Sequence, residues 1–272
     1  MGLNSIFNGA TKLPTVPKIV QELIKSFDDP DVKVDDLTKK IAMDPALTVK
    51  LLRMANSSYF GSSRDVSSVS DAVITLGFNR LRTLVLASGI TGAFDYPKSF
   101  DKNLFWKNSF ESAAICKSLA KYSSADQETA FTCGMLGDIG TILILTTFPE
   151  DMGRILEQAA KGENRRDLEL TTFDFTATEV SAGLAKLWRF PDAIVNALRW
   201  QDEPKSSDGS AYAFLLAISN FIQEKRIDLT SEQLCDAFPL ALAKGAGLNT
   251  DKLLKNMDSV LEVDAVMDGL LD

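Results

Sequence analysis

The sequence predicts an all-α fold, and three observations lead to that prediction. Apolar residues recur at intervals of three and four through most of the 272 residues, which is the spacing of one helix face. Serine, threonine, aspartate or proline stands where most of these stretches begin, as at helix N-termini. No stretch alternates polar and apolar residues convincingly with the period of two that a half-buried strand shows.

The first hundred residues predict five helices. Asp44 and Pro45 have the residue types of an N-cap and a first helical residue, and Gly77 separates the last two helices. Residues 57–68 are rich in serine, glycine and charge, which predicts a loop. The five helices are expected at residues 16–27, 34–43, 44–56, 69–76 and 78–94.

Residues 95–98, Asp-Tyr-Pro-Lys, indicate a linker between two helical layers. We therefore expect an N-terminal helical subdomain at 1–95 and a second helical part at 96–272, packed as one unit. Residues 126–147 are apolar on nearly every side, so that helix should be central. The other helices of the second part are expected at 104–121, 149–160, 176–187, 191–200, 210–224 and 231–242.

The tail at 251–272 carries six acidic residues against two lysines. Its apolar residues fall on two helical faces whose phase slips near Glu262. These acidic helices could pack on their own domain or dock onto another subunit or a partner, and the sequence leaves both readings open.

Composition narrows the possible functions, above all because the chain contains no histidine. It therefore lacks the commonest nitrogen ligand of transition metals and the usual acid or base near neutral pH. The net charge of −8 disfavours non-specific binding to nucleic acid or an anionic membrane. No run of about 18 apolar residues predicts a membrane span, and we expect a cytoplasmic protein. Three widely spaced cysteines, Cys116, Cys133 and Cys235, indicate reduced core thiols.

Residues 36–56 have the outline of a helix-turn-helix, which would direct Thr48, Lys50 and Arg53 toward DNA. No clustered basic arm accompanies them, so ordinary helix packing is the preferred interpretation. Gly134, Gly137 and Gly140 are spaced like a phosphate loop but lie inside an apolar helical stretch. Close helix packing explains that spacing better than phosphate binding.

Three motifs resemble the HDOD (HD-related output domain) family of bacterial signalling proteins over about residues 13–205. They are Leu-Pro-Thr-Val-Pro at 13–17, the segment from Asp44-Pro45-Ala46-Leu47 to residues 51–57 (Leu-Leu-Arg-Met-Ala-Asn-Ser), and Ala-Val-Ile-Thr-Leu-Gly at 72–77. The resemblance implies an all-helical fold in which an N-terminal bundle packs on a core similar to HD-type metal-dependent phosphohydrolases.

The resemblance also places the metal ligands of such enzymes on this chain, and every expected histidine is replaced. The positions hold Asn108, Gly137 (whose partner Asp138 remains), Ala177, and Gln201 with Asp202. We therefore expect no metal, no cofactor and no catalysis, and a vestigial cleft instead. Its candidate ligand-facing residues are Asn108, Gly137, Asp138, Ala177, Glu179, Trp200, Gln201 and Asp202.

We therefore expect the protein to be a non-enzymatic signalling module that binds other signalling proteins in trans or senses a ligand in the cleft. The alternative is a phosphohydrolase whose metal is held only by oxygen ligands, from Asp138, Glu179 and Asp202. Nucleic acid and membrane are not expected partners, whereas self-association is possible. For a partner surface the sequence offers the acidic tail and the motif helices, with Asp44, Lys50, Arg53 and Asn56 as candidates.

Overall fold

A computed structural model of the chain describes residues 2–9, 13–27, 29, 32–56, 65–97, 100–205 and 210–262. These residues form eighteen α-helices and no β-strand, which confirms the predicted all-α class. Most of the predicted loop at 57–68 and the last ten residues of the tail lie outside the described residues.

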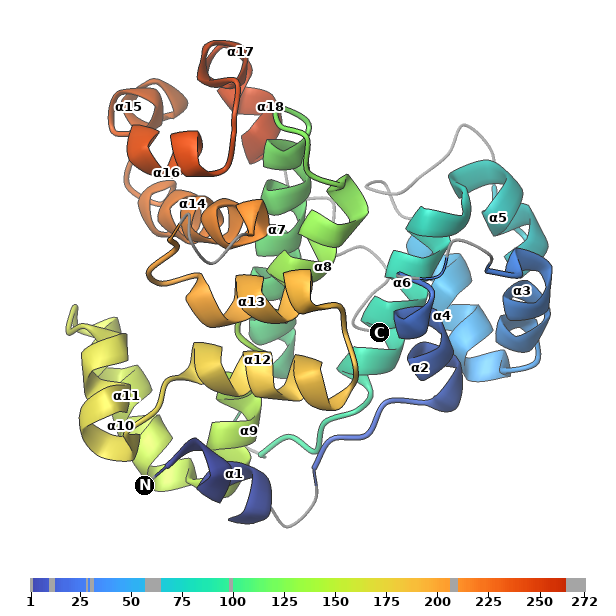
Figure 1. Ribbon diagram of the computed structural model, residues 1–272, viewed down its shortest axis with the longest axis horizontal. Helices are drawn as coiled ribbons and strands as arrows, with labels where there is room; N and C mark the ends of the chain where they lie inside the picture. The colour runs from blue at the N-terminus through green and yellow to red at the C-terminus, as the bar shows by residue number, and fades with distance from the viewer. Residues whose placement is uncertain are drawn as a thin grey trace.

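The five helices expected in the first hundred residues are present and lie together (Figure 1). The Asp44 side chain accepts the Leu47 N–H at 3.0 Å, so it is the N-cap that the sequence indicated. Gly77 has φ +82°, a conformation that favours glycine, and it separates the last two helices. The five are α2 (Lys18–Lys25), α3 (Val34–Ala42), α4 (Pro45–Ala55), α5 (Val69–Leu76) and α6 (Phe78–Thr91).

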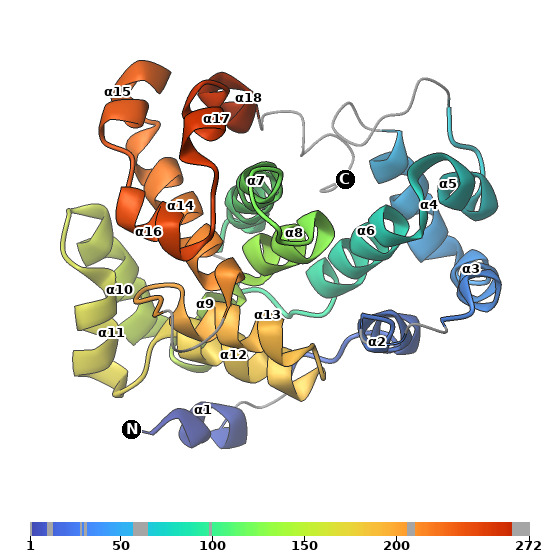
Figure 2. The same ribbon diagram turned by 45° about the horizontal axis from the view of Figure 1, so that its top comes forward.

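The helix α6 connects this bundle to the rest of the molecule. It packs against α2, α4 and α5 and also against α8 (Gln127–Leu136) of the second part, and its residues 81–90 are all buried. Figure 2 shows α6 between the two groups of helices. A second connection comes from Trp188, whose Nε1 donates to the Pro14 carbonyl at 3.0 Å.

The second part is a layered helical core. Its helix α7 packs on α8 and α14, while α12 packs on α9 and α13. The short helix α1 (Leu3–Gly9), which we did not predict, contacts α9 and places the Phe7 ring against Gly183 of α12. The core helices are α7 (Lys102–Ala120), α8 (Gln127–Leu136), α9 (Ile139–Thr147), α10 (Pro149–Ala160), α11 (Arg165–Phe173), α12 (Ala177–Leu187), α13 (Asp192–Trp200) and α14 (Ala211–Lys225).

The prediction of one continuous helix at 126–147 is wrong, because the chain breaks between α8 and α9 at residues 137 and 138. The segment Gln127–Thr147 is long and apolar enough to cross a membrane, but 83% of its most apolar window is buried in the protein. Packing therefore accounts for its apolarity. Glycine is required at 134 and 140, where an added Cβ would lie 2.5 Å from Ala113 Cα and 2.1 Å from the Ala177 carbonyl oxygen.

The prediction of a single helix at 231–242 is also wrong. This segment forms two helices, α15 (Ser231–Asp236) and α16 (Leu240–Gly245). Pro239 stands between them and lacks the N–H that a helix interior needs. The described part of the tail forms α17 (Thr250–Leu254) and α18 (Met257–Leu261). Leu253, Met257 and Val260 are buried and α18 contacts α7, so this part packs on its own domain.

Candidate functional site

A cavity of about 310 Å³ opens among α7, the α8–α9 break, α11, α12 and α14. Six of the eight residues that we predicted to face a vestigial cleft line it: Asn108, Gly137, Asp138, Ala177, Gln201 and Asp202. Glu179 and Trp200 line a neighbouring cavity of about 160 Å³, which shares Arg166, Thr178 and Asp202 with the first. The Glu179 carboxylate also accepts the Thr176 N–H at 2.9 Å, in a capping box at the start of α12.

The break between α8 and α9 places Asp138 at the cavity. Side chains from other parts of the chain stabilise this break. The Gly137 carbonyl accepts hydrogen bonds from Ser181 Oγ at 3.1 Å and from Gln201 Nε2 at 2.9 Å. In a continuous helix that carbonyl would bind the Thr141 N–H, which here donates to the Asp138 carbonyl. Ser181 Oγ also accepts the Gly140 N–H at 2.9 Å. The break is therefore caused by side chains inserted into the helical hydrogen-bond ladder.

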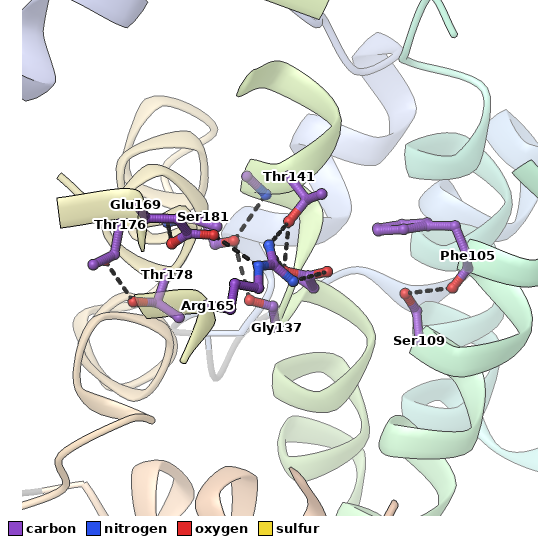
Figure 3. A network of polar contacts seen from close by, with 12 residues as sticks. Phe105, Ser109, Gly137, Thr141, Arg165, Glu169, Thr176, Thr178 and Ser181 are labelled. Atoms are coloured by element: carbon purple, nitrogen blue, oxygen red, sulfur yellow. Dashed lines mark hydrogen bonds and ion pairs between the residues drawn. The ribbon is translucent and has the colours of Figure 1, made fainter. Parts of the chain in front are cut away.

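Arg165, at the start of α11, binds the carboxylate of Asp138. Its Nη2 lies 3.0 Å from Asp138 Oδ1 and its Nη1 lies 3.3 Å from Asp138 Oδ2, a bidentate arrangement. Nη2 also donates to the Thr141 hydroxyl, which in turn donates to Asp138 Oδ1 at 2.6 Å. Both oxygens of the Asp138 carboxylate therefore have protein donors, and Figure 3 shows the Thr141 hydroxyl beside the Arg165 guanidinium.

The same guanidinium binds a second carboxylate. Arg165 Nε donates to Glu169 Oε1 at 2.7 Å, and Glu169 Oε2 accepts the Ala177 N–H at 2.7 Å. The Glu169 side chain is only 4% exposed. Ala177 stands where a histidine ligand was expected, and it contributes a backbone donor instead. We call Asp138, Arg165 and Glu169 the charged wall of the cleft.

The charges on this wall stabilise one another. Burial alone would lower the pKa of Arg165, but the carboxylates of Asp138 and Glu169 outweigh burial and raise it. Burial raises the pKa of Glu169, against the opposing effects of Arg165 and the Ala177 N–H. Arg165 is therefore a permanent cation between two carboxylates.

This arrangement does not fit a metal ion. A metal held at Asp138 would have to displace the guanidinium from both carboxylate oxygens. Asp138, Glu179 and Asp202, the three oxygen ligands of the alternative hypothesis, do not converge, since Glu179 lines the neighbouring cavity. Among the residues that the structure describes, no group of three histidine, cysteine, aspartate or glutamate side chains is placed to hold a metal.

Carboxamide side chains form the other side of the cleft, which we call the amide wall: Asn108 of α7 with Asn220 and Gln223 of α14. Gln223 Nε2 donates to the Asn108 backbone carbonyl at 2.9 Å, and Asn220 Nδ2 lies 3.4 Å from Gln201 Oε1. Phe105 also lines this side, and Figure 3 shows its ring pointing from α7 toward Arg165.

The predicted partner-surface residues have separate roles. Asp44 caps α4, and Asn56 exchanges hydrogen bonds with the Val66 backbone at 2.7 and 2.8 Å, which fixes residues on either side of the predicted loop. These contacts give both residues a structural role. Lys50 and Arg53 are exposed on α4.

Sequence patterns did not indicate Arg165 and Glu169, because no helix was predicted for residues 163–175. Signals for α11 were present: Asn164 caps it by accepting the Asp167 N–H at 3.1 Å, and Arg165 and Glu169 have the i,i+4 spacing of a helical ion pair. The contact between Arg165 and Asp138 spans 27 residues and has no local sequence signal.

Comparisons with known proteins concern the family and the fold of the chain. The family profile of the HDOD domain matches residues 13–204. A crystal structure from Shewanella amazonensis, named "Putative phosphohydrolase", has a TM-score of 0.84 and 30% identity, covering 97% of both chains.

Two curated proteins are similar over part of their length. An uncharacterised protein of Treponema pallidum is 26% identical over 200 residues, 72% of this chain and 39% of its own. The cyclic di-GMP phosphodiesterase CdgJ of Vibrio cholerae is 28% identical over 127 residues, 46% of this chain and 28% of its own. This chain thus spans well under half the length of both curated relatives.

Proposed function

The chain belongs to the HDOD family, and we propose that it is a non-enzymatic signal-transduction module of the cytoplasm. It acts by contacts with other signalling proteins in trans or by sensing a ligand in the cleft. It needs no metal and no cofactor. The match of the HDOD profile over residues 13–204 and the similarity to a protein named as a cyclic di-GMP phosphodiesterase support a role in signalling.

One observation carries the non-enzymatic part of this proposal, namely the guanidinium of Arg165 on the Asp138 carboxylate. A metal-dependent phosphohydrolase uses its metal to polarise a phosphoryl oxygen and to generate hydroxide from bound water. A guanidinium supplies positive charge but has no open coordination position, and it cannot lower the pKa of a bound water in that way. Its proton also stays in place, because neighbouring carboxylates raise the pKa of Arg165.

The competing function is phosphohydrolysis, which the name of the Shewanella protein suggests. A direct test incubates the purified chain with Mg²⁺, Mn²⁺ or Fe²⁺ and a panel of phosphomonoesters and cyclic dinucleotides, and measures released phosphate and opened dinucleotide. We expect no turnover above that of a D138A variant. Metal-dependent turnover that D138A abolishes would contradict the proposal, whereas turnover unchanged in D138A would indicate a contaminating enzyme.

A further inference from the structure

The charges around the cleft bear on which ligands it can accept. Three carboxylates line the cavity, Asp138, Glu169 and Asp202, against two arginines. Arg165 is bound by the first two carboxylates, and Arg166 Nη1 is paired with Glu203 at 2.6 Å. An entering phosphate would therefore meet arginines already neutralised and an excess of negative charge, which opposes its binding.

Asp202 differs from the other two carboxylates. It accepts a hydrogen bond from the Thr178 hydroxyl at 3.2 Å and makes no ion pair with a cation in the described part of the chain. Its carboxylate is exposed at the junction of the two cavities. An exposed carboxylate that makes no ion pair can accept hydrogen bonds from the N–H donors of a ligand.

The amide wall provides donors and acceptors together. The Asn108 side chain has no hydrogen-bond partner among the described residues, and the Gln223 Oε1 and Asn220 Oδ1 acceptors are likewise unused. Carboxamides recognise groups that present a donor beside an acceptor, as nucleobase edges do. Phe105 on the same side offers an aromatic ring against which a planar group can stack.

From these observations we propose that the cleft binds an uncharged planar ligand with a donor-rich edge, of the chemistry of a nucleoside base, and rejects its phosphorylated form. The edge donors bind Asp202, the remaining polar atoms bind the amide wall, and the plane lies against Phe105. The volume of about 310 Å³ is at the lower end for ligand pockets and suits a ligand of that size. This inference rests on the proposed function, because the ligand is bound and not converted.

Isothermal titration calorimetry of the full chain tests the proposal with three matched probes. Guanosine carries two kinds of N–H donor on its base edge, inosine lacks the exocyclic amino group, and guanosine 5′-monophosphate adds charge to guanosine. We expect guanosine to bind, and inosine and the monophosphate each to bind about tenfold more weakly, as expected for one lost hydrogen bond to a charged group or one repulsive contact. Absence of guanosine binding, or equal affinity for guanosine and its monophosphate, would overturn the proposal.

Variants then assign the binding to the cleft. D202A and N220A change exposed side chains and should keep the fold, and each should weaken guanosine binding about tenfold. The control is Q158A, which removes a carboxamide from α10 that does not line the cavity, and its affinity should equal that of the wild type. Unchanged affinity in D202A and N220A would overturn the proposal.

Chromatography of the same mixtures distinguishes this inference from the proposed function. Guanosine that binds and is recovered unchanged supports both. A lack of binding without any hydrolysis overturns only the ligand assignment. Release of phosphate from the monophosphate, abolished in D138A, would overturn the proposed function itself.

Discussion

The cleft has a charged wall, built from Asp138 in the α8–α9 break and from α11, and an amide wall, built from α7 and α14. On the charged wall every carboxylate oxygen of Asp138 and Glu169 has a donor from Arg165, Thr141 or the Ala177 backbone. On the amide wall, carboxamide atoms of Asn108, Asn220 and Gln223 have no hydrogen-bond partner among the residues that the structure describes. The difference shows that one side of the site satisfies its own charges while the other keeps polar groups available to a ligand.

Replacing Arg165 should have the largest effect, because it removes the cation that compensates both carboxylates. Glu169 is 4% exposed, and a buried carboxylate without its partner is strongly destabilising. Since Arg165 is itself 31% exposed, we expect R165A to lower the free energy of unfolding by about 2–4 kcal/mol, measured by urea denaturation. The matched change on the amide wall, N108A, removes an exposed side chain and should cost less than about 0.5 kcal/mol. Equal effects of R165A and N108A would contradict the contrast between the walls.

Ser181 tests how the charged wall is positioned. Its hydroxyl binds both the Gly137 carbonyl and the Gly140 N–H, so S181A leaves a buried backbone donor without its partner. We expect a loss of about 1–3 kcal/mol in urea denaturation. S123A is a suitable control, because that hydroxyl lies in a partly buried turn outside the cleft. A stable S181A would mean that the break between α8 and α9 does not depend on this side chain.

Cysteine reactivity tests the packing beneath the amide wall. Cys116 of α7 is fully buried, with its Sγ 3.8 Å from the Leu215 carbonyl oxygen of α14, and burial raises the pKa of its thiol to about 12. Burial also raises the pKa of Cys133, and thiolates are the reactive form. In the native protein at pH 8 we expect a thiol reagent to modify only the half-buried Cys235, and all three cysteines after unfolding. Modification of Cys116 before unfolding would show that α7 and α14 separate readily.

A smaller effect is expected in the pH dependence of the charged wall. Burial raises the pKa of Glu169 above its usual value of 4.5, so the folded state holds this proton more tightly than the unfolded state does. Its contribution to stability is therefore complete below pH 4.5 and is lost as the pH rises through the folded-state pKa. E169Q removes this titration, and the difference in urea midpoint between wild type and E169Q should decrease from pH 4.5 to pH 7. An increase over that range would mean that Arg165 holds the pKa of Glu169 below 4.5.

Local patterns predicted much of the fold, since helix periodicity and caps such as Asp44 are properties of neighbouring residues. Local sequence patterns gave wrong predictions where residues far apart in the sequence determine whether a helix continues. The break at Gly137 depends on Ser181 and Gln201, which lie 44 and 64 residues away, and the apolar stretch around it resembles one continuous helix.

The candidate site divides in the same way. The resemblance to the HDOD family indicated six residues that line one cavity: Asn108, Gly137, Asp138, Ala177, Gln201 and Asp202. It gave no indication of Arg165, which has no counterpart among the expected ligands, or of Asn220 and Gln223 on α14. Those residues became visible only through their spatial relation to Asp138 and Asn108.

The central claim is that Arg165 takes the place of the metal at Asp138. Titration of the chain with Mn²⁺, followed by electron paramagnetic resonance of the free ion, tests it most directly. We predict that all added Mn²⁺ stays free at protein concentrations up to about 100 μM, a range in which a functional metal site would be occupied. Stoichiometric binding of Mn²⁺ that is lost in D138A would contradict the claim, because it would show that the ion displaces the guanidinium from Asp138.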